Sequence, residues 1–238
     1  MNNITHLLWT GGWDSTFRLL QLLFEKKVKV QPHYIIADGQ TASEEIVTMN
    51  KIRQHLYHKY PKTRELLRPI IFFDKRRIDH CDEIHNAYIE TKKRQPIQLQ
   101  YETFARYCRQ IGADSIELSV LKNETIDFDL ANKVIFSHFT YPLVGYTKKK
   151  IADLSKRNEW EEIMFMTWFC RRPVNGQPCG FCGPCSDVAE AGLSKRLPWK
   201  AKLIAHLQLP LRKFWRDNYH MQSAPIIRSA KKILDRKY

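Results

Sequence analysis

The sequence lacks the features that mark membrane and secreted proteins. It has no run of about 18 apolar residues, so we expect no membrane span. Its opening stretch, MNNITHLLWTGG, has no basic segment followed by an apolar run and a cleavage site, so we expect no secretion. Cysteine is limited to six residues in 238, which favours a reducing compartment over a disulfide scaffold. We therefore expect a cytoplasmic protein with no membrane partner.

Several common nucleotide-binding and metal-binding motifs are also absent. There is no GxxxxGK[ST] segment, which excludes a Walker loop, and no GxGxxG segment, which excludes the dinucleotide fingerprint. None of the nine histidines lies in an HExxH pair, so we expect them in surface or core roles. The chain also has no internal repeat and no low-complexity linker. A nucleotide site, if there is one, must be of another kind.

Positive charge is abundant, with a formal net charge of +14 at pH 7. Residues 199–238 hold ten Lys and Arg against two Asp and Glu, which is more than half of the excess. Such a balance is typical of proteins that meet nucleic acid, an acidic protein or an anionic substrate. The length predicts one large domain with a small appendage. We divide it into a main domain (1–166), a cysteine-rich segment (167–198) and a basic helical tail (199–238).

Apolar runs that predict strands alternate with patterns that predict helices. The predicted strands are 5–9, 31–37, 69–73 and 115–120, and the predicted helices between them are 14–26, 44–58 and 101–111. This order is typical of a doubly wound α/β fold, in which helices cover both faces of a parallel sheet. Ligands of such sheets bind beyond the carboxyl ends of the strands, and Gly11 and Gly12 fall at one of these ends.

The segment TGGWDS, residues 10–15, joins the first predicted strand to the first predicted helix. Glycines let the backbone approach a ligand closely, and the free N–H groups at a helix start favour an anion. The Thr10 hydroxyl can donate to a phosphate. A plain tight turn between strand and helix is the alternative. The segment predicts a phosphate-binding loop.

Four cysteines form the pattern C-x8-C-x2-C-x2-C in a segment rich in glycine and proline. They are Cys170, Cys179, Cys182 and Cys185. Four thiolates can surround a tetrahedral Zn²⁺ and leave no position open for catalysis, so we predict a structural zinc site. An iron–sulfur cluster is the alternative. Cys81 and Cys108 fit neither, and we expect them to be buried as small apolar residues.

The glycine loop resembles the SGGxDS loop of the PP-loop ATP pyrophosphatases, with Thr10 in place of the serine. Together with the cysteine spacing, residues 4–195 resemble the 7-cyano-7-deazaguanine synthase family. Two further stretches agree with that family: Gly39-Gln40 followed by Glu45-Ile46, and Pro142-Leu143 followed by Thr147-Lys148. The resemblance implies an adenine nucleotide alpha hydrolase-like fold that cleaves ATP between its α and β phosphates and adenylates a carboxylate.

The resemblance also implies site residues and cofactors. Asp14 would lie near Mg²⁺, and Lys148 would neutralise the phosphates in the transition state, so both are candidate catalytic residues. The adenine would lie near the end of the second strand, around residues 37–40. The implied ATP-binding residues are Thr10, Gly11, Gly12, Asp14, Ser15, Thr16, Ala37 and Gln40. The implied cofactors are ATP, Mg²⁺ and Zn²⁺.

The stretches that would bind the substrate depart from this family. The family's Gly-Arg-Asn stretch is replaced by RQPIQLQYETF, its tyrosine before Gly-Gln is Asp38, and Ser186 stands where an arginine usually follows the last cysteine. These departures indicate a divergent branch with an altered pocket, and some members in antiviral operons join a deazaguanine-type base to a protein. We expect a 7-deazaguanine-type acid as substrate, with ammonia or an amine of an acidic protein as acceptor. A homodimer is left open.

Two other classes of function compete with this interpretation. A PP-loop tRNA-modifying enzyme, of thiolase or ligase type, would explain the basic tail and its aromatic residues Phe214, Trp215 and Tyr219, on which bases could stack. Against it, tRNA thiolases commonly use paired catalytic cysteines, whereas these cysteines have metal-site spacing. A non-catalytic zinc module that binds nucleic acid would leave the glycine loop unexplained.

Overall fold

A computed structural model describes residues 4–37, 41–113, 115–121 and 132–217 of the chain. The chain divides into two compact units, Met1–Phe169 and Cys170–Tyr238. The first unit holds the glycine loop, and the second holds the four clustered cysteines.

The first unit is built on a five-stranded parallel sheet with strand order β3-β2-β1-β4-β5. The strands are β1 (Ile4–Leu8), β2 (Lys29–Ile36), β3 (Ile71–Asp74), β4 (Ile116–Glu117) and β5 (Phe139–Thr140). The structure confirms the predicted doubly wound α/β class and its four predicted strands. It adds β5, whose two residues are too few to give a period in the sequence.

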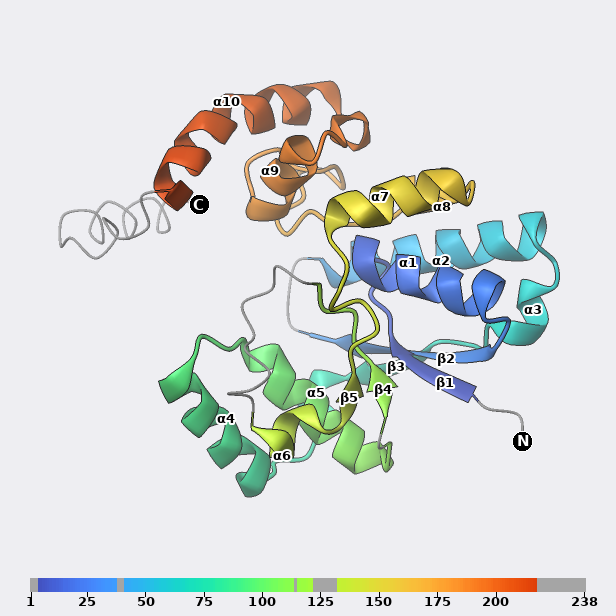
Figure 1. Cartoon of the computed structure of the whole chain (residues 1–238), viewed down its shortest axis with the longest axis vertical. Helices are drawn as coiled ribbons and strands as arrows, with labels where there is room; N and C mark the ends of the chain where they lie inside the picture. The colour runs from blue at the N-terminus through green and yellow to red at the C-terminus, as the bar shows by residue number, and fades with distance from the viewer. Residues whose placement is uncertain (1–3, 38–40, 114, 122–131, 218–238) are drawn as a thin grey trace. The chain divides into compact units, whose positions relative to one another are not determined.

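Helices cover both faces of this sheet, as Figure 1 shows. One face carries α1 (Trp13–Leu20), which continues as the π-helical segment η1 (Gln21–Glu25), together with α2 (Ala42–Lys59), α7 (Lys148–Arg157) and α8 (Glu161–Phe165). The other face carries α4 (Asp82–Arg94), α5 (Leu99–Ile111) and α6 (Lys133–Phe136). Two short helices, α3 (Thr63–Leu66) and the 3₁₀ turn η2 (Lys75–Arg77), lie beside β3 in the sequence. Because both faces are covered, the central strands are buried.

The order of the strands reverses between β1 and β4. The chain runs from β1 through β2 to β3 at one edge, and then returns to place β4 on the other side of β1. Leu8 of β1 is in register with His33 of β2, and His6 is in register with Ile116 of β4. In open parallel sheets, the crevice at such a reversal is where ligands bind. The glycine loop follows β1 at this point.

A buried ion pair joins helix α1 to strand β4 at the reversal. Arg18 of α1 donates from Nε and Nη2 to the carboxylate of Glu117 in β4, at 2.6 and 2.7 Å. Both side chains are largely buried, at 5% and 13% exposed. The pair fixes the helix that follows the loop to the strand on the other side of the crevice.

The second unit consists of turns and helices around the cysteines. It holds α9 (Gly183–Glu190), the 3₁₀ turn η3 (Ser194–Arg196) and α10 (Trp199–Asp217). Asn175 and Gly176, both at positive φ, form a tight turn between the bridged residues Val174 and Gln177. Gly180, at φ +81°, lies so close to α10 that an added Cβ would be 2.4 Å from the carbonyl oxygen of Ala201.

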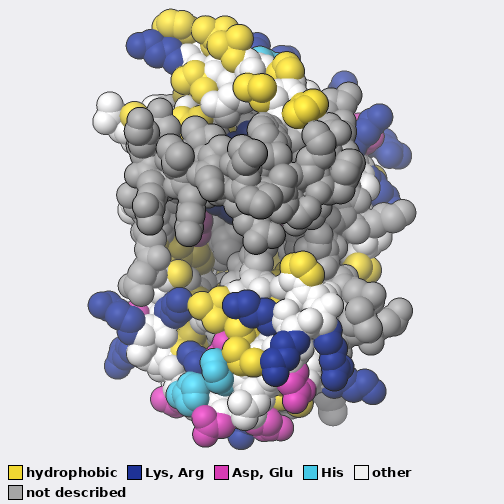
Figure 2. Space-filling model, turned by 90° about the vertical axis from the view of Figure 1, so that its left-hand side faces the viewer, with side chains coloured by type: hydrophobic (Ala, Val, Ile, Leu, Met, Phe, Trp, Pro, Cys, Tyr) yellow, Lys and Arg dark blue, Asp and Glu magenta, His cyan; other side chains and the backbone are white. Residues whose placement is uncertain are grey.

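One side of α10 exposes large hydrophobic side chains. Trp199, Leu203, Leu207, Leu211 and Phe214 are each more than half exposed. Figure 2 shows hydrophobic side chains gathered over α10, with Lys and Arg beside them. Despite this apolar side, no helix in the described part of the chain is both long and apolar enough to cross a membrane.

Candidate active site

The glycine loop turns the chain sharply between β1 and α1. The Trp9 N–H still bonds to the His33 carbonyl at 3.0 Å, as in a strand, whereas Gly11 adopts the left-handed conformation at φ +69°. Gly12 is the N-cap of α1, and the Thr16 N–H donates to its carbonyl to close the first helical turn. A side chain at Gly11 would be strained and would also meet Met49 Cγ at 3.0 Å. The loop therefore needs glycine at this position.

Hydroxyl groups and backbone N–H groups converge inside the loop. Thr10 Oγ1 lies 3.4 Å from Ser15 Oγ and accepts from the Gly12 N–H at 3.3 Å. The Thr10 N–H donates to Ser15 Oγ at 3.4 Å. These hydrogen bonds are long, so a stronger acceptor could replace them. The N-terminal end of α1 contributes the positive end of its dipole to the same place. The arrangement suits an anion such as a phosphate.

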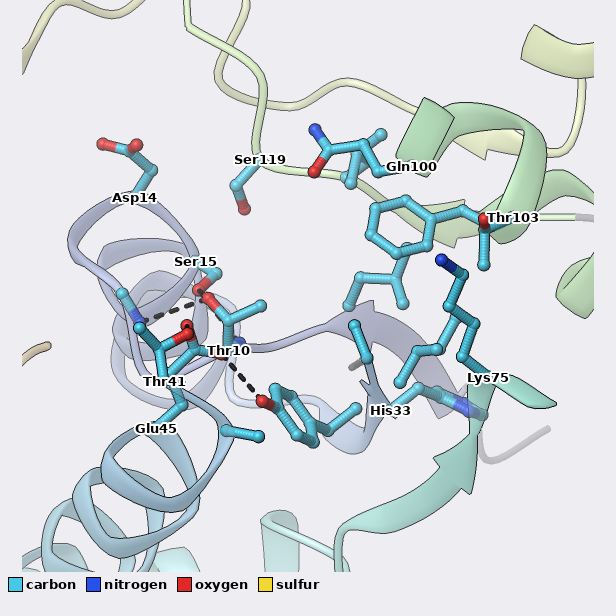
Figure 3. Close-up of a pocket in the computed structure, with 18 of the residues that line it drawn as sticks. Thr10, Asp14, Ser15, His33, Thr41, Glu45, Lys75, Gln100, Thr103 and Ser119 are labelled. Atoms are coloured by element: carbon cyan, nitrogen blue, oxygen red, sulfur yellow. Dashed lines mark hydrogen bonds between the residues drawn. The ribbon is translucent and has the colours of Figure 1, made fainter. Parts of the chain in front are cut away.

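A cavity of about 460 Å³ opens beyond the carboxyl ends of the strands, in front of this loop. It has the size of an ordinary small-molecule site. Five of the predicted ATP-binding residues line it: Thr10, Gly12, Asp14, Ser15 and Ala37. Figure 3 shows Thr10, Asp14 and Ser15 on one side of the cavity and Lys75 with Gln100 and Thr103 on the other. These five residues therefore share one cavity, and their binding of ATP stays a prediction.

Three other predicted residues are not part of the cavity lining, and a fourth is not described by the structure. Gly11 shapes the loop without being among the residues that line the cavity. Thr16 is fully buried, and its Oγ1 accepts a hydrogen bond from Trp9 Nε1 at 3.0 Å. Lys148 is the exposed first residue of α7, beside its N-cap Thr147, and does not belong to the lining. Gln40 lies outside the described residues. Their roles toward ATP stay predictions.

Several lining residues were missed by the sequence reasoning. They include His33, Tyr34, Thr41, Glu45, Lys75, Gln100, Thr103 and Ser119. Lys75 directly follows β3 and Ser119 follows β4, so the rule that ligands bind at the carboxyl ends of parallel strands could have found both. Ser119 Oγ is buried and has no hydrogen-bond partner in the described part of the chain. It is therefore a donor that a ligand could use.

Glu45 is a second acidic residue of the cavity lining, in addition to Asp14. Tyr34 donates to Glu45 Oε2 at 2.8 Å, and Thr41 donates to Oε1 at 3.2 Å. Burial raises the pKa of Glu45, and these two hydrogen bonds oppose the rise by favouring the carboxylate. Burial next to Glu45 also raises the pKa of Tyr34, so Tyr34 stays a hydrogen-bond donor. Glu45 is thus held in place by its own neighbours.

His33 is buried in the sheet at the wall of the cavity. Its two ring nitrogens lie 2.8 Å from His6 Nδ1 and 2.7 Å from the Tyr107 hydroxyl. Burial, aided by the charge of His6, lowers the pKa of His33 to about 4. His33 is therefore neutral at physiological pH, and its hydrogen bonds connect β1, β2 and α5.

The four clustered cysteines form a candidate metal centre in the second unit. All four are buried, and their sulfur atoms lie within 4.8 Å of one another. Four of the Sγ–Sγ distances are 3.4, 3.6, 3.9 and 3.9 Å. Sulfurs around a tetrahedral Zn²⁺ with Zn–S bonds of about 2.3 Å would be about 3.8 Å apart. The geometry therefore fits zinc.

Backbone N–H groups support the same cluster. The Cys179 N–H donates to Cys170 Sγ at 3.3 Å, and the Cys182 N–H donates to Cys179 Sγ at 3.4 Å. Such bonds stabilise thiolates and orient them toward a metal. Cys108 is buried, as predicted, whereas Cys81 is partly exposed and accepts from Arg109 at 3.1 Å. The prediction for Cys81 therefore holds in part: it packs against the hydrophobic core just before α4 but is not fully buried.

Two solved structures are distantly similar to this chain. No protein-family model matches the sequence, and no curated protein matches it. A predicted subunit of a tRNA methyltransferase from Methanocaldococcus jannaschii is similar in structure, with a TM-score of 0.40 and 12% identity over 64% of this chain and 74% of that chain. A 4-thiouridine synthetase, solved with RNA and bound ATP, has a TM-score of 0.38 and 12% identity over 87% of this chain. This chain spans 53% of that synthetase.

Fold and site together define a class of protein. The chain is an α/β protein with a five-stranded parallel sheet, helices on both faces, and a four-cysteine cluster that could hold zinc. Its cavity lies at the strand ends, next to a loop suited to an anion.

Proposed function

We propose that this protein is an ATP-dependent adenylating enzyme that activates a carboxylate. The observation that carries the proposal is the loop of residues 10–15. Its hydroxyls, Gly12 and the start of α1 line one side of a cavity at the reversal of strand order. This loop also carries the sequence resemblance to the PP-loop ATP pyrophosphatases.

The proposed reaction has two steps. A carboxylate oxygen of the substrate attacks the α-phosphorus of ATP, the bond to the β-phosphate oxygen breaks, and pyrophosphate leaves with the electron pair. An amine then attacks the acyl carbonyl carbon and AMP leaves, with loss of a proton from the nitrogen. Adenylation is needed because a free carboxylate would have to expel oxide or hydroxide, which are poor leaving groups.

The chain's residues divide between the two ends of this reaction. Thr10 and Ser15 would donate to the departing pyrophosphate, and Asp14 would hold Mg²⁺, which neutralises phosphate charge when bound. The cavity wall near Ala37, at the end of β2, would receive the adenine. Lys148 is kept as a proposed catalytic residue on the resemblance of the stretch around it, although it lies outside the cavity lining.

The proposed substrate is a 7-deazaguanine-type acid such as 7-carboxy-7-deazaguanine. The proposed acceptor is free ammonia, which would give an amide, or an amine of an acidic protein, as in a conjugating antiviral enzyme. A nitrile would need a second ATP, which adenylates the amide oxygen so that it leaves as AMP while the nitrogen loses its two protons. The basic stretch of residues 199–238 supports the protein acceptor, because opposite charge speeds encounter between macromolecules.

The test is incubation with ATP, Mg²⁺ and 7-carboxy-7-deazaguanine, with and without ammonia, followed by assays for pyrophosphate and AMP and by mass spectrometry. We expect both products, and we expect Asp14→Ala to abolish them. Asp153→Ala, which removes an exposed acid on α7, is the matched control and should behave as wild type. Absence of pyrophosphate release with the acid contradicts the proposed substrate. Salt-sensitive tRNA binding that stimulates ATP cleavage would favour the RNA-modifying alternative.

A further inference from the structure

The side of the cavity opposite the glycine loop contains a lysine that forms no ion pair with any acid among the residues that the structure describes. Lys75 follows β3 directly and is the first residue of η2. It lines the cavity, and Figure 3 shows its ammonium group reaching toward the side where Gln100 and Thr103 lie. Thr10, Asp14 and Ser15 are on the other side. A cation in this place is available to a ligand.

The acid beside Lys75 in the sequence is already paired. Asp74 accepts from the Arg76 N–H at 2.9 Å, and one of its carboxylate oxygens lies 2.6 Å from Arg76 Nη2. This pairing with Arg76 lowers the pKa of Asp74 to about 2. Arg76 is exposed, so the pair faces solvent. Within this turn, Asp74 and Arg76 pair with each other, and Lys75 lines the cavity.

The carboxylates that line the cavity are also some distance from Lys75. Glu45 is held by Tyr34 and Thr41, and Asp14 lies on the loop side. In the described ranges, no carboxylate lies within 4.0 Å of the Lys75 ammonium. An ammonium in a partly enclosed site without a counter-ion favours an anionic ligand, because the pair forms in a medium less polar than water.

We propose that Lys75 binds the carboxylate of the acid that is adenylated. The inference depends on the proposed function. In an in-line displacement at phosphorus, the attacking oxygen and the leaving oxygen lie on opposite sides of the phosphorus atom. If pyrophosphate leaves toward Thr10 and Ser15, the carboxylate must approach from the far side, where Lys75 lies. One carboxylate oxygen can accept from the ammonium while the other attacks.

The residues around Lys75 indicate what carries this carboxylate. Leu99 and Phe104 of α5 line the same cavity, and they offer apolar surface. Gln100 adds an exposed amide that can both donate and accept. The Thr103 hydroxyl donates to the Leu99 carbonyl at 3.3 Å. Apolar walls with one amide and one cation suit a flat ring that has polar edges and carries a carboxylate. They suit the same kind of ring without a carboxylate less well, because the cation would then have no partner.

The test compares Lys75→Ala with Arg77→Ala. Arg77 lies in the same turn, is exposed and is not part of the cavity lining, so its replacement removes the same charge without touching the site. Calorimetry with the α,β-methylene analogue of ATP measures nucleotide binding alone. Titration of 7-carboxy-7-deazaguanine into the protein with this analogue measures acid binding. The concentration dependence of pyrophosphate release gives the KM for the acid.

Lys75→Ala should leave the Kd of the analogue unchanged and raise the Kd and KM of the acid about 10- to 100-fold, the range for loss of a charged hydrogen bond. Lys75→Arg should restore part of the acid affinity, and Arg77→Ala should behave as wild type. Unchanged acid affinity in Lys75→Ala, or weaker binding of the analogue, overturns the inference. If wild type binds the analogue but releases no pyrophosphate, the proposed reaction fails. Lys75-dependent binding of the acid would then still support the inference, and no acid binding would overturn it.

Discussion

Replacing Gly11 by alanine should abolish nucleotide binding while the protein stays folded, because the change alters the shape of the loop more than the stability of the fold. Gly112, the C-cap of α5, is a matched control because it has a similar φ, +64° against +69°, and nothing within 4 Å of an added Cβ. The left-handed conformation alone should cost about 1–2 kcal/mol in either variant. At Gly11 the new Cβ also meets Met49 Cγ at 3.0 Å and Thr48 Cγ2 at 3.3 Å. This crowding should add about 1 kcal/mol.

Urea unfolding followed by circular dichroism should therefore show both variants folded, with Gly11→Ala the less stable by about 1 kcal/mol. Calorimetry with the α,β-methylene analogue of ATP should show normal nucleotide binding in Gly112→Ala and none in Gly11→Ala. Equal destabilisation would show that the loop tolerates a side chain at Gly11. Normal nucleotide binding by Gly11→Ala would remove the loop from the proposed mechanism.

Three further predictions concern the metal centre, α10 and pH. Elemental analysis should find one zinc per chain, lost when Cys182 is replaced by serine, whereas iron with visible absorption would contradict the zinc assignment. Gly180→Ala should cost at least about 2 kcal/mol more than Gly176→Ala in urea unfolding, because both are at positive φ but only Gly180 abuts backbone atoms of Ala201; equal costs would contradict the packing. Folding lowers the pKa of His33 from 6.5 to about 4, so the folded protein favours the neutral ring. The stability that depends on the neutral ring is therefore complete above pH 6.5 and is lost as the pH falls toward 4. The loss of stability between pH 7 and pH 4 should be smaller by about 3 kcal/mol in His33→Gln than in wild type; an equal loss in that variant would refute the role of His33.

Local sequence patterns were enough to predict those parts of the protein whose conformation depends on residues close together in the sequence. The glycine loop is a run of six residues, and its turn depends on Gly11 and Gly12 themselves. The cysteine cluster is similarly local, since three of its members fall within seven residues. The strands β1 and β2 could be predicted because each ends in a short apolar run, Leu7-Leu8 in β1 and Tyr34-Ile35-Ile36 in β2.

The other side of the cavity depends on long-range packing. Lys75 and Gln100 on that side, and Ser119 after β4, come from three separate segments and line one cavity only because β3, β2, β1 and β4 pair in that order. No spacing in the sequence encodes this order. Helix α4 was also missed, because it is mostly polar and buries a narrow stripe that includes Ile84 and Tyr88. The helical spacing of its apolar residues was therefore too weak to predict α4 from the sequence.

The hydrogen bond from the Trp168 N–H to the Gly11 carbonyl, 3.0 Å long, has a consequence for exchange of that amide with solvent. Trp168 lies two residues before Cys170, where the second unit begins. The end of the first unit is thus anchored to the loop that we propose to bind phosphate. An anion that orders this loop stabilises the closed hydrogen bond by linkage and so slows deuterium uptake at Trp168. The rate of deuterium uptake at this single amide therefore reports whether an anion occupies the loop. The measurement requires no knowledge of the reaction that the protein catalyses.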